Sequence, residues 1–281
     1  MPALTGCLSH TRIVPKTRLA SIVMGSNLDQ LVKQLDTRYN AIQTMNADIE
    51  ISKISGGSLQ GQVKESISLG GYIFIRKPED LRVYLKVPVV SSLAMDMASD
   101  GTNFKLYIPS EHKAIVGSNQ VTTPSKNSLE NLRPEVFLGS LLVRGVGDDQ
   151  LVSMTLDTRI VDNSAKKKGD LIEEPEYQLS ILAKPQGKEV HTLRVVHIDR
   201  ENLLPYKQET YDESGQIVTR ALYSNYQLFG DVEYPMKITI ERPLDHLGLN
   251  LTITKLTLNQ KLEDDQFDLK IPDGVPIQKM Q

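Results

Sequence analysis

The chain has 281 residues, of which 40% are hydrophobic and 24% charged, with a net charge of −3 at pH 7 and a single cysteine. The weak negative charge gives no reason to expect a nucleic-acid-binding protein, because such proteins present a strongly basic face. One cysteine allows neither an intramolecular disulfide nor a thiolate metal cluster, and no apolar run reaches the roughly 18 residues of a membrane-spanning helix.

The first motif is Leu4-Thr5-Gly6-Cys7, an aliphatic residue and two small residues before the cysteine. This order is typical of bacterial lipoprotein precursors, in which the cysteine becomes the acylated N-terminus. The alternative is a chance pattern, because the basic start and apolar run of a signal are missing and a lone cysteine is often a small buried hydrophobe. We expect residues 1–25 to comprise a truncated signal, a lipidated Cys7 and a flexible tether.

A long amphipathic helix is predicted next. Ser26 with Asp29 three residues later is a helix-capping signature. Apolar side chains then recur at helical spacing, which predicts one stripe that packs on a sheet. The stripe comprises Leu28, Leu31, Val32, Leu35, Tyr39, Ile42 and Met45.

From about residue 47 the apolar pattern changes to a period of two, which is typical of strands. Glycine, proline, asparagine and aspartate in short turns separate the runs, and this combination predicts an antiparallel meander that forms a large curved sheet or barrel. The predicted strands cover residues 48–54, 62–76, 81–86, 93–98, 104–108, 151–161, 177–183, 192–198, 205–211, 217–226, 235–242 and 249–258.

Two irregular regions interrupt the strands. The first, residues 117–145, contains a loop at 124–127 and a short helix predicted to begin near Pro134, because proline suits the first helical position. The second, residues 162–176, carries three consecutive lysines at 166–168 followed by acidic residues. Such a charge block is usually a solvated loop, and we do not interpret the lysines as a binding patch.

No catalytic or metal-binding motif emerges. The five histidines are scattered, and His191 and His197, predicted to share one strand, are too far apart to ligate one ion together. Glu65, Glu111 and Glu135 form no recognisable carboxylate pair. The acidic run at 263–268 is interpreted as a turn into a final strand and not as a calcium loop. We therefore predict no enzyme, no cofactor and no metal.

An unusual apolar loop follows the strand at 81–86. Loops normally run over the surface and are polar, but Val89, Val90 and Leu93 come together in this connection. An exposed apolar loop marks a contact with a membrane or a protein partner. The alternative, that Val89 and Val90 fold into the core beneath the helix, is equally compatible with the sequence.

A curved sheet has one concave face, and an apolar concave face that helices cover only in part is a natural site for an acyl chain. The aliphatic faces of the predicted strands supply the candidate lining, although each of these residues also suits a dry core. The candidates are Ile73, Ile75, Leu81, Val83, Leu85, Ile238, Ile240, Leu249, Leu251 and Ile253.

Four short motifs in this order resemble the bacterial lipoprotein-localisation (Lol) family. They are TMNAD at 44–48, GGYIFIRKPEDLR at 70–82, SDGTNFKLYIP at 99–109 and DQFDLKIPDGV at 265–275. The resemblance covers about residues 27–276 and implies an incomplete barrel whose helices plug an apolar cavity for lipoprotein acyl chains. With Cys7 lipidated, the chain is more similar to the outer-membrane receptor, whose protruding apolar loop the Val89-Val90…Leu93 connection resembles.

The sequence thus predicts a mainly β protein with some α structure, an incomplete (half-open) antiparallel β-barrel with an N-terminal amphipathic helix and a short plug helix over its concave face. Residues 26–281 form one lipoprotein-carrier-like domain in this prediction. The expected function is to hold acyl chains of lipoproteins or a lipid and deliver them to the outer membrane, on its periplasmic side. The alternative is an envelope sensor that detects lipids or lipoproteins in the same cavity and signals to a protein partner.

Overall fold

The structure is a computed structural model that describes residues 17–19, 23–57, 62–119, 130–162, 171–185 and 187–280. The motif ending at Cys7, the loop at 124–127 and the lysines at 166–168 lie outside the described residues. Neither of the two α-helices in the described part is long and apolar enough to span a membrane.

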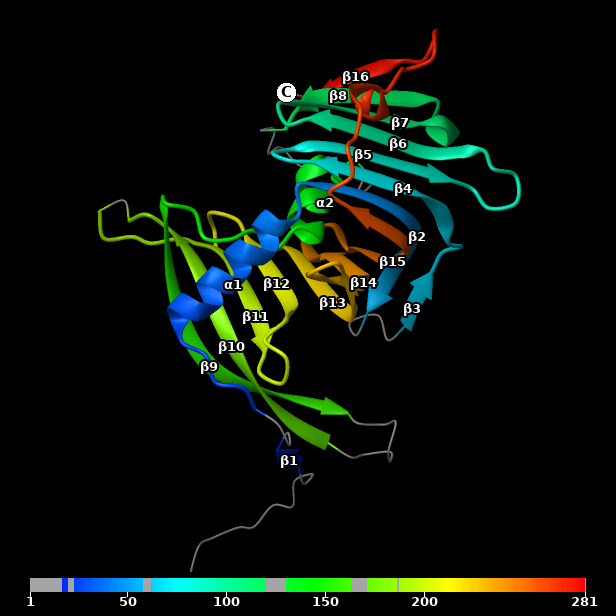
Figure 1. The fold of residues 1–281 in the computed structure, drawn as a ribbon. Coiled ribbons are helices and arrows are strands. Elements are labelled where there is room, and N and C mark those ends of the chain that lie inside the picture. Colours follow the sequence, from blue (N-terminus) through cyan, green and yellow to red (C-terminus); the bar gives the residue numbers. More distant parts are fainter. Residues whose placement is uncertain are drawn as a thin grey trace, which may run out of the picture.

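Sixteen strands form one continuous, strongly curved sheet in the described part of the chain (Figure 1). The strands are β1 (Thr17–Leu19), β2 (Thr44–Gly57), β3 (Gln62–Glu65), β4 (Leu69–Arg76), β5 (Asp80–Lys86), β6 (Leu93–Asp100), β7 (Asn103–Ile108), β8 (Lys113–Ser118), β9 (Gln150–Asp162), β10 (Leu171–Ala183), β11 (Thr192–Asp199), β12 (Pro205–Tyr211), β13 (Ile217–Phe229), β14 (Val232–Arg242), β15 (Leu247–Leu258) and β16 (Ile277–Met280).

The strand order is β10-β11-β12-β13-β14-β15-β2-β4-β5-β6-β7-β8-β16, with β9 and β1 on β10 and β3 on β2. Antiparallel pairing of β15 with β2 joins the late meander to the early one. The ends of the sheet, β9 and β16, do not pair with each other in the described structure, so the barrel stays open. The predicted half-open antiparallel barrel is confirmed.

Helix α1 (Leu28–Ala41) begins one residue later than the sequence suggested. Asn27, not Ser26, is the N-cap, and its side chain accepts the Gln30 N–H while Gln30 accepts the Asn27 N–H in return. The helix also ends before the last predicted apolar positions. Met45 belongs to β2, where it lies opposite Ile75 of β4, because pairing on both sides of β2 outweighs continuation of the helical stripe.

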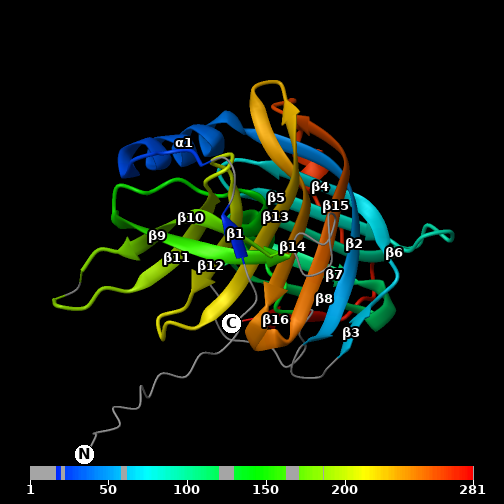
Figure 2. The ribbon, with the colours of Figure 1, turned by 90° about the horizontal axis from the view of Figure 1, so that it is seen from below.

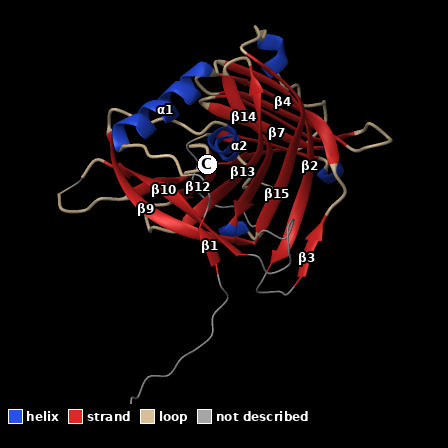
Figure 3. Cartoon of the chain, turned by 60° about the horizontal axis from the view of Figure 1, so that its bottom comes forward, coloured by secondary structure: helices blue, strands red, loops and turns tan. Residues whose placement is uncertain are grey.

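Helix α2 (Pro134–Leu141) begins with proline at the first helical position, as the sequence predicts. It lies inside the curve of the sheet, where Figure 3 shows it end-on among β13, β14 and β7. Helix α1 instead lies across β10, β11 and β12 (Figures 1 and 2). Both helices therefore cover the concave face, in agreement with the predicted plug.

One face of the sheet is apolar from β10 to β15 except at Gln208. Leu179, Val196, Gln208, Ala221, Ile240 and Leu249 are successive cross-strand partners from β10 to β15. Cross-strand partners share a face, and all of these side chains are buried. They join the cluster beneath α1, which contains Leu31 and Leu35, to the main core around α2.

The opposite, convex face of β4–β6 is covered by the C-terminal segment. A short 3₁₀-helix, η3 (Asp264–Phe267), places the Phe267 ring against Phe74 with centroids 6.5 Å apart. Arg82 forms a bidentate pair with buried Asp96 and also donates to the Asp268 carbonyl. The acidic run thus forms a short helix on this face, and the final strand, β16, begins only at Ile277, later than the sequence suggests.

The predicted solvated region at 162–176 is wrong in its second half. Residues 171–176 continue β10, and their partners are residues 157–162 of β9. The predicted strand at 62–76 is instead two strands, β3 and β4. Pairing with β9 and the ion pair of Arg159 with Glu174 stabilise this part of β10, so the charge block did not by itself indicate a loop.

Candidate functional site

The ten residues proposed from sequence as lipid-binding lie together in one core cluster on the concave side of the sheet. Each is at most 6% exposed. The structure thus brings them together as interior side chains, and none of the ten lines the apolar cavity that we describe next. Their contact with a lipid stays a prediction.

Helix α2 packs in the same core cluster as these residues. Its Val136, Phe137, Leu138 and Leu141 side chains are buried in the same cluster, and Phe137 is fully buried. Four apolar side chains on so short a helix make α2 an apolar plug. Helix α2 therefore covers this part of the concave face.

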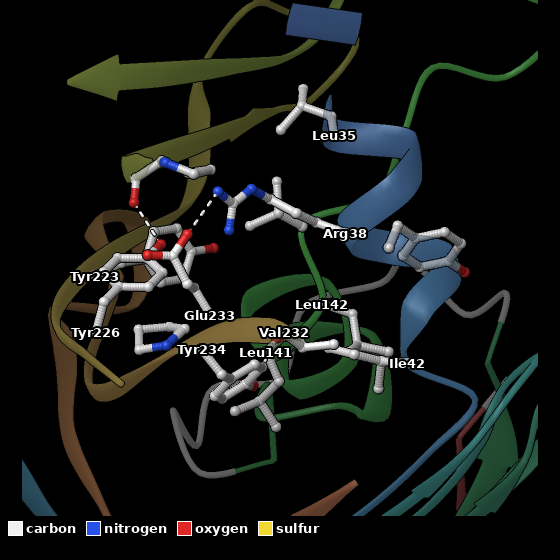
Figure 4. Close-up of a pocket in the computed structure, with 14 residues that line it drawn as sticks. Leu35, Arg38, Ile42, Leu141, Leu142, Tyr223, Tyr226, Val232, Glu233 and Tyr234 are labelled. Carbon is white, nitrogen blue, oxygen red and sulfur yellow. Dashed lines mark hydrogen bonds and ion pairs between the residues drawn. The ribbon is translucent and has the colours of Figure 1, made fainter. Parts of the chain in front are cut away.

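A residual apolar cavity of about 50 Å³ remains beneath the C-terminal half of α1 (Figure 4). It is bounded by α1, the segment that follows α2 and the hairpin of β13 and β14. A void of about 150 Å³ is needed to hold a benzene ring, so an acyl chain fits only if a helix moves. The lining residues are Leu35, Arg38, Tyr39, Ile42, Leu141, Leu142, Val143, Pro205, Tyr223, Tyr226, Val232, Glu233, Tyr234 and Pro235.

Two buried tyrosines, Tyr223 and Tyr234, and the partly buried Tyr226 bring hydroxyl groups to this cavity. The Tyr234 hydroxyl donates to the Leu141 carbonyl at 2.8 Å, and the Tyr226 hydroxyl donates to the Pro205 carbonyl at 2.5 Å. The Tyr223 hydroxyl has no hydrogen-bond partner among the described residues. Burial raises the pKa of all three phenols, so they are neutral donors at physiological pH.

Polar contacts tie α1 to its surroundings at the margins of the cavity. Arg38 Nη2 lies 3.0 Å from Glu233 Oε2 on β14, across the cavity mouth in Figure 4. On the other flank, Asp36 Oδ1 accepts the Val146 N–H at 3.1 Å. A side chain at Gly145 would clash there, because its Cβ would lie 1.8 Å from Asp36 Oδ1.

Arg194 of β11 holds the segment that follows α2. Its guanidinium donates to the carbonyl of Arg144 at 2.6 Å and to the carbonyl of Gly145. Burial lowers the pKa of Arg194 to about 10, which leaves it protonated at neutral pH. In the described structure, a few side-chain contacts therefore hold α1 and the segment that follows α2 in place.

Two larger grooves flank α1. One, of about 550 Å³, lies between α1 and the tip of the β13–β14 hairpin and shares Arg38, Val232 and Glu233 with the cavity. The other, of about 650 Å³, lies between α1, α2 and β11–β12 and shares Tyr39 and Leu142 with it. The apolar cavity therefore adjoins an open groove on both sides of the helix.

The apolar loop between β5 and β6 projects from one end of the strands. Val89 is 101% exposed and Val90 is 68% exposed, while Leu93 begins β6 and is partly buried. Of the two alternatives that the sequence left open, the structure places both valines at the surface. A contact with a membrane or a partner stays a prediction.

A buried polar cluster on β10–β12 escaped the sequence analysis. His197 lies between Glu176, 3.2 Å from Nδ1, and Glu209, 3.3 Å from Nε2. The prediction that His191 shares the strand of His197 is wrong, because His191 precedes β11 and is exposed. Glu176, His197 and Glu209 come together only through the register of β10, β11 and β12. The described part of the chain contains no group of residues arranged to bind a metal.

The two carboxylates of this cluster ionise readily in spite of their burial. Burial acts to raise the pKa of Glu176, but hydrogen bonds with His197 and Gln178 outweigh it and hold that pKa below 4.5. Arg220, 2.8 Å from Glu209, has the same effect on the pKa of Glu209. The stability that these groups contribute is therefore present above pH 4.5 and is lost as the pH falls through their lower folded-state values.

Glu209→Gln is expected to lower the free energy of unfolding at pH 7 by about 1.5–3 kcal/mol, since it removes charge-assisted hydrogen bonds. Urea unfolding of both proteins at several pH values checks this. The difference between them should shrink below pH 4.5, where wild-type Glu209 itself becomes protonated. A difference that stays constant down to pH 3 would contradict the assignment.

Comparisons with known proteins give the fold a family context. A family model described as "Uncharacterized protein" matches residues 155–270, and no curated protein matches the sequence. A LolA superfamily protein from Nitrosomonas europaea is similar in structure, with a TM-score of 0.53 and 15% identity over 87% of this chain and 99% of that chain.

Two further solved structures extend this comparison. A DUF1329 family protein from Desulfovibrio piger has a TM-score of 0.52 and 15% identity over 85% of this chain and 95% of that chain. A putative outer membrane lipoprotein-sorting protein domain from Vibrio parahaemolyticus has a TM-score of 0.49 and 14% identity, over 85% and 94% of the two chains. The fold is thus similar to that of the LolA superfamily protein and the DUF1329 family protein, and at this identity the likeness extends to the fold alone.

Proposed function

We propose that this protein is a lipid-binding carrier of the bacterial envelope. It holds an acyl chain of a lipoprotein or another lipid against its concave face, beneath α1 and α2, and releases it to the outer membrane without covalent chemistry. The observation that carries the proposal is the apolar concave face of an open barrel, covered by two helices with a residual cavity beneath them. The likeness in fold to a LolA superfamily protein supports it.

Binding in this proposal requires that α1 moves. The helix buries only Leu31 and Leu35, which together stabilise its docking by about 3–6 kcal/mol, at 1.5–3 kcal/mol each. The exposed Arg38–Glu233 pair adds about 0–1 kcal/mol. Burial of about ten methylene groups would contribute about 8 kcal/mol, so an acyl chain can offset the undocking of α1.

We further propose that the protein is anchored and docks at a membrane like a receptor. Cys7 would carry the acyl anchor, and the exposed Val89 and Val90 side chains would contact the outer membrane during release. Replacement of Cys7 by serine in cells is expected to move the protein from the membrane fraction to the soluble fraction. Wild-type protein that carries no acyl group at Cys7 by mass spectrometry would contradict the anchor.

Acyl binding is tested directly with the full chain. Native mass spectrometry of protein purified from a bacterial host should show one bound acyl lipid, and the delipidated protein should bind a fluorescent fatty acid that unlabelled lysophospholipid displaces. No bound lipid, no fluorescence change and no thermal shift at saturating lipid would together reject the proposed function.

Closing the cavity mouth should weaken this binding. Val232 lines both the cavity and the adjoining groove, so Val232→Trp is expected to weaken fatty-acid affinity about tenfold or more, given an overpacking cost of about 1–3 kcal/mol. The matched control is Val190→Trp, because Val190 is 46% exposed and lies outside the cavity. Equal affinities for the two variants would place the ligand elsewhere.

A further inference from the structure

One polar atom in the cavity lacks a partner. Tyr223 of β13 is 5% exposed and lines the cavity, and its hydroxyl forms no hydrogen bond with any described residue. Tyr226 and Tyr234, which line the same cavity, both donate to backbone carbonyls. Because these neighbours are satisfied, Tyr223 is the buried phenol that remains available to a ligand.

An unpaired buried hydroxyl is costly. It loses its hydrogen bonds to water on folding and gains none in return, and native proteins seldom leave such a group unsatisfied without a reason. Its cross-strand neighbour on β14 is Ile238, and Tyr223 belongs to the apolar core cluster, where no described group is placed to form a hydrogen bond with its hydroxyl. A ligand that brings an acceptor oxygen to this point would satisfy the group.

We infer that the cavity recognises the carbonyl oxygen of an acyl ester or acyl amide, and that the Tyr223 hydroxyl donates to it. The inference rests on the proposed function and names the polar group of its ligand. An acyl chain attached through such a carbonyl would lie along the aliphatic walls formed by Leu35, Ile42 and Leu142. Tyr223 is thus a specificity-determining residue.

A neutral carbonyl fits this cavity better than a charged group. Arg38, the cation among the lining residues, is already paired with Glu233. Arg194 lies close enough to influence Tyr223, but its donors are directed to the carbonyls of Arg144 and Gly145. A carboxylate or phosphate beside Tyr223 would therefore be desolvated without a free counter-charge, which is far more costly than burying a hydrogen-bonded carbonyl.

Two lipids that differ in one carbonyl test this inference. The probes are 1-palmitoyl-glycerophosphocholine, which carries an ester, and 1-O-hexadecyl-glycerophosphocholine, which carries an ether at the same position. Calorimetric titration below the micellar concentration of each lipid should show wild-type protein binding the ester about five- to tenfold more tightly, as one hydrogen bond allows. Tyr223→Phe should lower the ester affinity to that of the ether and leave the ether affinity unchanged.

The melting temperature separates this role from a structural one. Tyr223→Phe removes only an unsatisfied hydroxyl, so the ligand-free variant should melt at the same or a higher temperature than wild type. The comparison variant Tyr206→Phe removes a hydroxyl that donates to Glu176, outside the cavity. It should lower the melting temperature and preserve the ester-to-ether ratio.

The outcomes distinguish the inference from the proposed function. If wild type binds both lipids equally, or if Tyr223→Phe weakens both equally, the inference is overturned while acyl binding stands. If wild type binds neither lipid, the proposed function fails and the inference fails with it. A fatty acid that binds tightly and depends on Tyr223 more than the ester does would also overturn the choice of a neutral carbonyl.

Discussion

The double variant Val89→Glu/Val90→Glu is expected to bind phospholipid vesicles at least a hundredfold more weakly than wild type and to unfold at the same temperature. The two side chains are 101% and 68% exposed, so they contribute almost nothing to the folded core. Insertion of a valine into an apolar phase yields about 1.5 kcal/mol or more. Loss of two such contributions, about 3 kcal/mol, corresponds to roughly a hundredfold in affinity.

Vesicle flotation measures this effect with the full chain in a Cys7→Ser background, because an acyl anchor at Cys7 would itself hold any variant on the vesicles. Leu228→Glu is the control, because Leu228 is also 68% exposed but lies near the tip of the β13–β14 hairpin, at the opposite end of the strands. The control should float with vesicles as wild type does. If the double variant also floats, the loop takes no part in membrane contact.

Leu31→Ala is expected to lower the free energy of unfolding by about 2–5 kcal/mol, the usual range for a fully buried leucine. Leu31 is 0% exposed and packs with Leu179, Ile181 and Val196 beneath α1. Since Leu31 and Leu35 are the buried residues of α1, the loss should fall mainly on the docking of that helix. Urea unfolding gives the size of the effect.

Hydrogen exchange shows where the loss occurs. In Leu31→Ala the amides of α1 should exchange faster, while those of β4 and β5 keep their wild-type protection. Val32→Ala serves as the comparison, because Val32 is only partly buried on the same helix and its truncation should cost about 1 kcal/mol or less. Equal acceleration of α1 and the central strands would show that the helix does not move independently.

Local patterns were enough to predict the helices and most strands. The stripe from Leu28 to Tyr39 and the proline at 134 gave α1 and α2, and alternation gave the long strands. The errors occurred where the sequence suits two structures. Ser26 and Asn27 are both good caps, Met45 fits a helix or a strand, and residues 171–176 are charged yet continue β10. Tertiary pairing decided each case.

The candidate site was only partly predictable. Residues such as Ile73, Ile240 and Leu249 were correctly expected to share one apolar face, because alternation fixes which side a strand residue occupies. The cavity itself was not foreseen. Tyr223 and Tyr234 line one cavity with Leu35 of α1, although they follow it in the sequence by 188 and 199 residues, and no local pattern encodes that arrangement. The Glu176–His197–Glu209 cluster depends in the same way on the register of three strands.

The central claim is that an acyl chain binds between the concave face and its two covering helices. The most direct test is cross-linking of the full chain with an acyl ester that carries a photoreactive diazirine in its chain, followed by peptide mass spectrometry. The account predicts labels on α1, on residues 141–143 and on the β13–β14 hairpin, all suppressed by excess unlabelled lipid. Labels confined to the loop at 87–92 or to the convex face, or labelling that unlabelled lipid does not suppress, would contradict it.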